Sequence, residues 1–345
     1  MIETGGEAVL DTEYQGAVAA SGELAPIDLV IVICTFRREK LLSLVLDSIR
    51  AQTVPPGTRI SVVVSDNSDE GSAAAVVAAE AAKSPFEIRY VEAHPPNISV
   101  ARNAGIRASD APFVAFVDDD EELAPGWLEA VVNGLRTYPH DVLFGHVDTV
   151  FETTERVTPA IRQLFSRFMQ APSGQEVVAI GAPKGRGLTV GTSNSILRRA
   201  TTLTDATPFD PDFGNVGGED LDFYCRLQMR GRRFAWLPEA RASEFVPASR
   251  CDPAYLRRRF YAGGQAYAEA VARNSAAPVA VRWWLRAKAL VQLCLLALRY
   301  PSARRQGGAV LTDFGFRWAG VRGKLSLAQL YPVYREADGA RRPAS

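Results

Sequence analysis

The sequence predicts one large α/β domain, with a mainly parallel, twisted sheet flanked by helices, followed by a helical extension at the C-terminus. Runs of β-branched residues, typical of strands buried on both faces, alternate with segments in which apolar residues recur at helical spacing. The chain of 345 residues is also long enough to bury a sizeable core. Such alternation implies a parallel sheet with right-handed crossovers, which binds ligands at the carboxyl ends of its strands.

The first third of the chain follows a strand-helix-strand-helix-strand pattern. Residues 29–33 form the first buried strand, and apolar residues then recur at helical spacing over residues 41–49. A second buried strand over residues 60–64 precedes an alanine-rich helix over residues 72–82 and a short strand over residues 87–91. The ends of these strands are therefore the first places to look for functional residues.

The middle of the chain continues the pattern. A helix over residues 99–109 leads to a fourth strand over residues 113–117, and an amphipathic helix begins near Trp127. We predict another strand over residues 142–150, and a mobile loop rich in glycine and basic residues over residues 181–191.

The two ends of the chain differ from the middle. Residues 1–26 contain acidic residues and no persistent period, which predicts a disordered tail. Residues 27–250 would form the main α/β domain, and residues 251–345, in which basic residues dominate, a helical extension. No basic stretch followed by an apolar one begins the chain, and no apolar run approaches the roughly 20 residues of a membrane span. We therefore expect neither a signal peptide nor a transmembrane helix.

Composition excludes several classes of function. The 39 Lys and Arg residues balance 39 Asp and Glu residues, so no global charge indicates nucleic-acid binding. The four cysteines lack a CxxC pair and the three histidines lack ligand spacing, which argues against a zinc site or a disulfide framework. No GxGxxG motif follows an early strand, as a dehydrogenase would require. A reducing cytoplasm is the expected location.

The strongest local signal is a run of three carboxylates, Asp118, Asp119 and Asp120, at the end of the fourth strand. Burial and like charge both make their ionised forms costly unless a cation or hydrogen-bond donors compensate. Carboxylate oxygens suit Mg²⁺ or Mn²⁺, and such ions bind substrate phosphates, so a diphosphate leaving group is the natural partner. A solvated acidic turn that caps the next helix is the alternative.

A second acidic group, Glu219 and Asp220, follows two glycines and starts a predicted helix. Gly217 and Gly218 would allow the backbone to approach a ligand closely, and the helix dipole would stabilise the carboxylates in their charged forms. A base in this position could take a proton from an acceptor hydroxyl. Simple helix capping would explain the same residues.

Two further strand ends carry groups suited to a nucleotide. Thr35, Phe36 and Arg37 follow the first strand and offer a hydroxyl, an aromatic face and a guanidinium group. Asp66 and Asn67 follow the second strand and suit a base edge or a ribose. A helix cap and a turn would also account for each set, so their weight comes from their order after successive strands.

As an ordered set, these motifs resemble glycosyltransferase family 2, whose GT-A fold is a nucleotide-binding α/β domain. Over about residues 29–238 the chain reads ICTFRR, VVVSDNSD, ISVARNAGI, FVAFVDDDEELAPGWL, GTSNSILRR and FDPDFGNVGGEDLDFYCRL, in the family's order. Residues 98–121 look most like bacterial exopolysaccharide and succinoglycan-type sugar transferases, which extend lipid-linked oligosaccharides on the cytoplasmic face of the membrane. The resemblance implies that residues 27–250 are a GT-A catalytic domain.

The resemblance also implies a role for each motif. The residues implied for the nucleotide and the donor sugar are Thr35, Phe36, Arg37, Asp66, Asn67, Arg102, Asn103, Asp118, Asp119 and Asn194. Asp118 and Asp120 would be the DxD pair, with Asp120 the main metal ligand and Arg102 near the diphosphate. Asp220 would be the catalytic base, although the adjacent Glu219 could take that role.

An inverting, metal-dependent sugar transfer is the implied reaction. The metal and Arg102 would stabilise the departing nucleoside diphosphate while the base deprotonates an acceptor hydroxyl, with UDP-sugars as the first donors to try. The chain departs from the family at one place, because many relatives have a histidine after the helix that carries the base. Glu244 stands near that place, either as a metal ligand or in a surface salt bridge.

The basic C-terminal part has its own interpretation. A helix over about residues 279–299 begins with Trp283 and Trp284 and mixes apolar residues with arginine and lysine, which suits an interfacial helix on anionic lipid. A saccharide or polyprenyl-diphosphate-linked acceptor would be found at such a surface, on the inner face of the cytoplasmic membrane. The alternative is that this helix packs on the main domain.

Two other functions stay open at this point. A sugar-nucleotidyltransferase would share the sheet and the acidic site, but it needs a glycine-rich phosphate loop where this chain has residues 35–38. A nucleotide- or carbohydrate-binding module without catalysis would be expected to lack the carboxylates, all of which are present.

Overall fold

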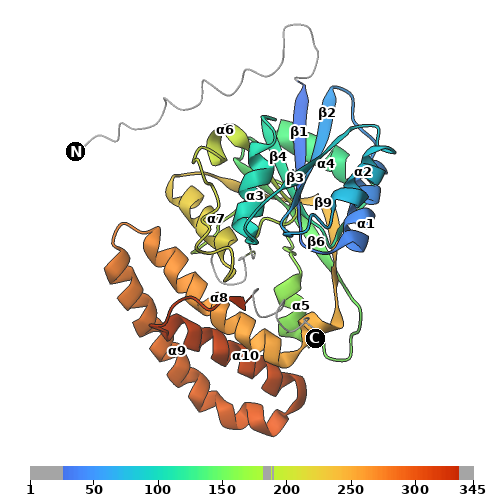
Figure 1. Ribbon diagram of the computed structural model, residues 1–345. Coiled ribbons are helices and arrows are strands. Elements are labelled where there is room, and N and C mark those ends of the chain that lie inside the picture. Colours follow the sequence, from blue (N-terminus) through green and yellow to red (C-terminus); the bar gives the residue numbers. More distant parts are fainter. Residues whose placement is uncertain (1–25, 182–187, 189, 334–345) are drawn as a thin grey trace, which may run out of the picture.

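A computed structural model describes residues 26–181, 188 and 190–333 of the chain. Figure 1 shows an α/β unit, in which helices cover both faces of a twisted sheet, and a separate group of helices from the C-terminal part of the chain. All but the last residue of the tail predicted over residues 1–26, and most of the loop predicted over residues 181–191, lie outside the described residues.

One half of the sheet is parallel, as predicted. Its strands are β1 (Ile27–Thr35), β2 (Thr58–Asp66), β3 (Glu87–Glu92) and β4 (Phe113–Asp118). The strand order is β3-β2-β1-β4, and the crossovers are α1 (Glu39–Arg50), α2 (Ala74–Ala81) and α3 (Ile98–Arg107). Thr35 pairs with Asp66 and Cys34 with Asp118, so the carboxyl ends of these strands lie at the same edge.

The other half of the sheet is mixed. The order continues from β4 through β8 (Ser195–Arg198), β6 (Val142–Phe151), β9 (Phe234–Val246) and β5 (Glu121–Leu123), and β7 (Glu176–Val177) pairs with β9. The short β8 is antiparallel to both β4 and β6. With these strands, the described residues form a single nine-stranded sheet.

Burial on both faces explains why the first strand reads as a continuous apolar run. Leu29, Ile31 and Ile33 pack on one face with residues of α1, α2 and α4 (Trp127–Thr137). Val30 and Val32 pack on the opposite face with residues of α3 and α7 (Glu219–Met229). Fully burying such a side chain contributes about 1.5–3 kcal/mol. The strand is therefore fixed from two sides, which fixes the groups at its end.

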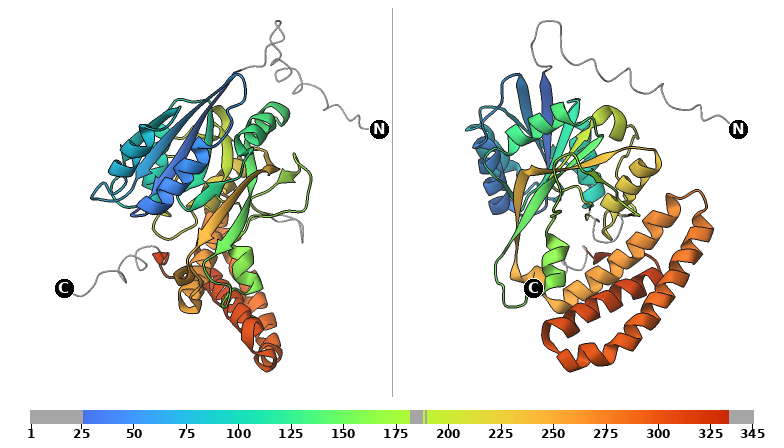
Figure 2. Two further views of the ribbon diagram at one scale, coloured as in Figure 1. Left: turned by 90° about the vertical axis from the view of Figure 1, so that its right-hand side faces the viewer. Right: turned by 180° about the vertical axis from the view of Figure 1, so that it is seen from behind.

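The chain leaves the sheet at β9 and enters a group of helices. These are η1 (Ala248–Cys251), α8 (Pro253–Arg273), α9 (Pro278–Gln306) and α10 (Gly308–Leu325), joined to the α/β unit beside α5 (Pro159–Phe165). Figure 2 shows them together at one end of the molecule, with α9 on the side away from the sheet. A Cβ atom at Gly264 of α8 would lie 2.1 Å from the carbonyl oxygen of Gly320, so glycine allows α8 and α10 to pack closely.

Within the described ranges, none of the helices combines the length and the apolarity that crossing a membrane requires.

Candidate active site

A cleft of about 1510 Å³ opens where the sequence predicted a site, at the carboxyl ends of β1, β2 and β4. It extends from there to η1 and to the first turns of α8. The predicted site residues among its lining are Thr35, Phe36, Arg37, Asn67, Arg102, Asp118, Asp119, Asp120, Glu219, Asp220 and Glu244. This volume exceeds the roughly 300–1,000 Å³ of most small-molecule pockets.

The aspartates after β4 form the acidic side of the cleft. Asp119 accepts a hydrogen bond from the Thr35 hydroxyl at 2.8 Å, because parallel pairing brings the end of β1 beside the end of β4. The guanidinium group of Arg38 donates to Asp119 at 2.8 Å and to Asp120 at 2.9 Å. Both carboxylates are almost completely buried. The turn after β1 therefore holds the aspartates through a hydroxyl and an arginine.

Glu244 joins the same acidic group from another strand. Because β5 pairs with β9, Glu244 lies opposite Glu121, just after the three aspartates. Arg250 in η1 lies between Glu244 and Asp120, with its Nη1 atom 3.4 Å from the glutamate oxygen and 3.2 Å from Asp120 Oδ2. Glu121 accepts from the backbone N–H of Asp118 at 2.9 Å. Five carboxylates from two segments distant in sequence thus meet at one end of the sheet: Asp118, Asp119, Asp120, Glu121 and Glu244.

This acidic group is short of positive charge. Burial, followed by repulsion from Asp120, raises the pKa of Asp118 to about 7 and that of Glu244 to about 8. Burial and the charge of Asp118 raise the pKa of Glu121 well above its usual value. A cation placed among these groups would relieve the repulsion that raises these pKa values, and their oxygen atoms are the ligands that Mg²⁺ and Mn²⁺ prefer.

Two arginines bind the carboxylate of Asp120, which lies at the centre of this acidic group. In the part of the chain that the structure describes, no three His, Cys, Asp or Glu side chains converge as a finished metal site. Instead, Arg38 and Arg250 both contact the same oxygen, Oδ2 of Asp120. The donor set suits a divalent cation, but a cation that binds this oxygen would compete with both guanidinium groups.

The second acidic group faces the cleft from the start of α7. The Arg102 guanidinium donates to Glu219 at 2.7 Å and to Asp220 at 2.6 Å, and is itself buried. Asp220 also accepts from the Thr192 hydroxyl at 2.6 Å. Burial and the neighbouring Asp220 raise the pKa of Glu219. Only 5% of the Glu219 side chain is exposed against 26% of Asp220, so Asp220 is the more accessible of the two.

One of the two glycines before α7 makes room for a neighbouring helix. Gly217 and Gly218 have φ values of 74° and 128°, which L side chains rarely adopt. A Cβ atom on Gly218 would lie 2.5 Å from the Cβ of Ala266, so this glycine makes room for α8. Gly191 also lies beside this acidic group, since a Cβ atom on it would lie 3.5 Å from Asp220 Oδ2.

The predicted nucleotide residues after β1 and β2 divide into two sets. Phe36 and Asn67 line the cleft. Arg37 also reaches it, in a left-handed backbone conformation with a φ of 55°, and its side chain is paired with Glu70 at 2.5 Å. The Asp66 carboxylate points inward and accepts the backbone N–H groups of Ser68 and Ala73 and the hydroxyl of Tyr90. It shapes the turn and is not among the cleft-lining residues described.

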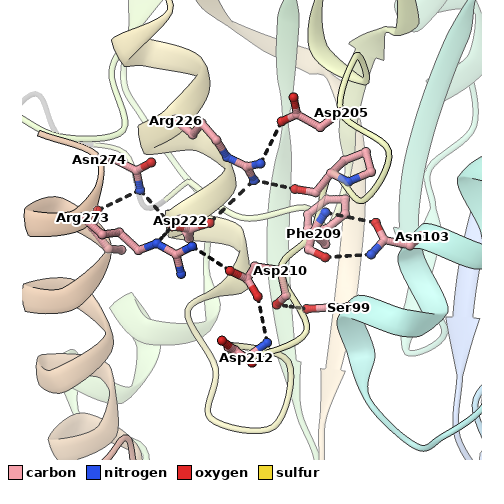
Figure 3. A network of polar contacts seen from close by, with 12 residues as sticks. Ser99, Asn103, Asp205, Phe209, Asp210, Asp212, Asp222, Arg226, Arg273 and Asn274 are labelled. Carbon is pink, nitrogen blue, oxygen red and sulfur yellow. Dashed lines mark hydrogen bonds and ion pairs between the residues drawn. The ribbon is translucent and has the colours of Figure 1, made fainter.

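Two predicted donor residues lie in the core. The Asn103 side chain exchanges two hydrogen bonds with the backbone of Phe209, at 2.7 and 3.0 Å (Figure 3). Asn194 is fully buried: its amide accepts from the Trp127 indole at 2.8 Å and donates to two carbonyl groups, of His146 and Ala240. The side chain joins β8 to β6, β9 and α4, and it is not among the cleft-lining residues described.

Asp222 and Arg226 attach α7 to the elements around it. Figure 3 shows Asp222 facing α8, where Asn274 donates to it at 2.8 Å and Arg273 lies 3.5 Å away. Arg226 binds Asp205 at 2.8 Å. These contacts attach the helix of the second acidic group to its neighbours.

No role was assigned from the sequence to three arginines that line the cleft, nor to Thr192, a buried threonine that binds Asp220. Arg38 follows the predicted Arg37 and could have been found by its position alone. Arg250 follows β9, and Arg167 donates to the carbonyl groups around Gly191 and Ser193. Arg167 lies in a stretch with no recognisable pattern. Thr192 lies in the GTSNSILRR motif, from which only Asn194 was selected.

Comparison with known sequences points to one class of enzyme. Residues 30–193 match the family model described as glycosyl transferase family 2, and residues 113–321 match that of glycosyl transferase family group 2. The succinoglycan biosynthesis protein ExoM of Rhizobium meliloti is 33% identical over 245 residues, which cover 71% of this chain and 75% of that protein. A pre-mycofactocin glycosyltransferase of Mycobacterium tuberculosis is 28% identical over 66% of this chain and 43% of its own length.

Solved structures share the fold. A mannosyltransferase from Pyrobaculum calidifontis in complex with GDP-Man and Mn²⁺ matches with a TM-score of 0.54 and 19% identity, over 86% of this chain and 85% of that one. S. aureus TarS 1-349 in complex with UDP-GlcNAc matches with a TM-score of 0.51 and 15% identity, over 86% and 90% of the two chains. These likenesses confirm the predicted GT-A fold.

Proposed function

This chain belongs to glycosyltransferase family 2 and is a glycosyltransferase, and we propose that it moves a sugar from a nucleotide-diphosphate donor to an acceptor hydroxyl. The observation that carries the proposal is one cleft with two acidic groups of different kinds. One is a buried cluster around Asp120 in which the carboxylates outnumber the two arginines that contact them, and the other is Asp220, paired with Arg102 at the cleft.

We assign the cluster around Asp120 to a divalent cation. Asp118, Asp120 and Glu244 would hold Mg²⁺ or Mn²⁺, which supplies Lewis-acid stabilisation of a leaving diphosphate when bound. Asp119 would support them, since Thr35 and Arg38 fix both of its oxygens. Arg38 and Arg250 would release Asp120 and turn toward the donor phosphates, where guanidinium groups bind well.

The turn after β1 and the end of β2 would bind the rest of the nucleotide. Phe36 offers an aromatic face at the cleft, and Asn67 offers an amide held by two contacts, with the carbonyl of Ala93 and the backbone N–H of Asn97. UDP-sugars are the first donors to test, on the strength of the family resemblance.

We assign the proton transfer to Asp220. Its carboxylate would take the proton of the acceptor hydroxyl while the acceptor oxygen bonds to the anomeric carbon and the bond from that carbon to the diphosphate breaks. A single in-line displacement of this kind inverts the anomeric centre, so an α-linked donor gives a β-linked product. Arg102 would position Asp220 through their 2.6 Å contact.

The acceptor would enter from the side of α8. The cleft is larger than a donor alone requires, and its far part is lined by Tyr255, Arg258 and Arg259. We propose a saccharide or a lipid-linked oligosaccharide as the acceptor, at an anionic membrane surface. Cell-surface polysaccharide synthesis is the proposed setting, because the relative from Rhizobium meliloti is a succinoglycan biosynthesis protein.

A nucleotide-release assay tests this function. We would measure nucleoside diphosphate released from UDP-, GDP- and dTDP-sugars with Mn²⁺, Mg²⁺ or EDTA, and read the anomeric configuration of the product by NMR. We expect metal-dependent release from one donor, lost by orders of magnitude in Asp120→Asn. Glu122→Gln is the matched control, since Glu122 lies in the same acidic run but is exposed. No release and no binding of any donor would refute the proposal.

A further inference from the structure

Helix α9 carries its large apolar side chains on the outside. Of the sixteen large apolar side chains exposed in the described residues, eight are on this helix, among them Trp283, Trp284, Leu290, Val291, Leu295 and Leu298. The side chains of Trp283 and Trp284 are 63% and 58% exposed, and that of Leu298 is 79% exposed. An apolar face of this extent on one helix usually marks a binding surface.

Only a narrow stripe of α9 is buried by the rest of the chain. Leu285, Ala289 and Ala303 are its buried residues, and the helix packs against α10 and α8. Figure 1 shows α9 at the edge of the helical group, away from the sheet. The sequence left open that this helix packs on the main domain. Its packing against α10 and α8 leaves most of its apolar surface uncovered.

Charge indicates what covers this surface. Six basic residues and no acidic residue occur over residues 278–312. Arg286 lies over the ring of Trp283 at 5.2 Å and Lys288 over that of Trp284 at 4.9 Å, so cationic groups border the apolar face. A second copy of the chain would bring the same basic face against itself, which like charges oppose. Anionic lipid offers both an apolar interior and the opposite charge.

We propose that α9 is a membrane-docking helix that lies in the interface of an anionic bilayer, with its tryptophans and leucines toward the acyl chains. Docking would place the enzyme beside a lipid-linked acceptor, so the proposal deepens the proposed function. Only the role given to docking rests on that function, and the binding to lipid itself does not. Helix α8 provides the connection, because its first turns line the cleft and its last residue, Arg273, precedes α9 by a short loop.

Vesicle co-sedimentation of the full chain tests the proposal without using catalysis. Wild-type protein should pellet with vesicles of equal phosphatidylglycerol and phosphatidylcholine at low salt, and much less with phosphatidylcholine alone. The double variant Trp283→Gln, Trp284→Gln should bind at least about tenfold more weakly, because the aromatic side chains enter the interface. Arg304→Gln with Arg305→Gln should lose a factor of about five per charge and bind with less dependence on salt.

Matched controls are available on the α/β unit. Leu44→Gln removes an exposed apolar side chain from α1, and Arg107→Gln removes an exposed charge at the end of α3, and both should bind as the wild type does. Nucleotide release by all variants in the absence of lipid should be unchanged, so failure of docking and failure of the transferase assignment give different results.

Two results would overturn the proposal. One is wild-type protein that stays in the supernatant with anionic vesicles, or a double tryptophan variant that pellets as well as the wild type. The other is a wild-type dimer in light scattering that becomes monomeric in the tryptophan variant without any lipid binding, which would make α9 an interface between chains.

Discussion

Exchanging the two neighbouring carboxylates of the second acidic group separately would identify the catalytic base. Asp220→Asn and Glu219→Gln both remove a negative charge and keep the size of the side chain. In the structure, each carboxylate receives one bond from the buried Arg102, but Asp220 is the more exposed of the two at the cleft. The chemistry and the stability should therefore respond differently to the two substitutions.

The expected magnitudes follow from these contacts. A general base contributes about 10²- to 10⁴-fold to turnover, so Asp220→Asn should lose that factor while donor binding persists. The unfolding free energy of Asp220→Asn should change by no more than about 1 kcal/mol, because Arg102 keeps Glu219 as a charged partner. The substitution also removes the repulsion between the two carboxylates. Glu219→Gln should lose less than about tenfold in turnover but about 2–3 kcal/mol in stability, since its buried oxygens serve Arg102 and the N–H of Gly218.

Turnover, donor affinity and urea unfolding would be measured on both variants. The assignment is wrong if Glu219→Gln shows the larger loss of turnover while Asp220→Asn is nearly normal. The less exposed carboxylate would then be the catalytic base. Near-normal turnover in both variants would contradict the assignment of this acidic group to catalysis altogether.

Two further predictions concern the other acidic group and the core. The Arg250→Gln variant should bind Mn²⁺ several-fold more tightly in the absence of nucleotide, because the substitution removes a guanidinium group that competes with the metal for Asp120. Calorimetry would measure the affinity, with Arg257→Gln as the control because Arg257 is exposed. An unchanged or weaker affinity for Mn²⁺ would contradict the prediction. Asn194→Ala should lower the unfolding free energy, measured in urea, by at least about 3 kcal/mol, because it leaves three buried groups without their hydrogen-bond partner. Normal stability together with a raised KM for the donor would instead indicate that Asn194 binds the donor.

The first half of the fold could be predicted because its signals are local. A strand buried on both faces has to be apolar at every position, and residues 29–33 show this directly. The short β8 could not be predicted, because its four residues have no period of their own. It pairs with β4 and β6, and the preceding Asn194 binds the carbonyl group of His146 in β6.

The candidate site divides in the same way. Asp118, Asp119 and Asp120 were visible because three carboxylates after a buried strand are unusual whatever surrounds them. Asn103 looked functional from its motif, yet it serves the core through the backbone of Phe209. An asparagine in a polar motif reads the same in sequence whether its amide faces a ligand or a carbonyl group.

The sequence by itself determined the fold class, the family and the two acidic groups, because each depends on residues close together along the chain. Only the tertiary structure decided which charges meet. Arg250 lies 130 residues from Asp120, and Arg102 lies 117 residues from Glu219. Electrostatic compensation depends on distance in space, and no local pattern records which arginine will stand beside which carboxylate after folding.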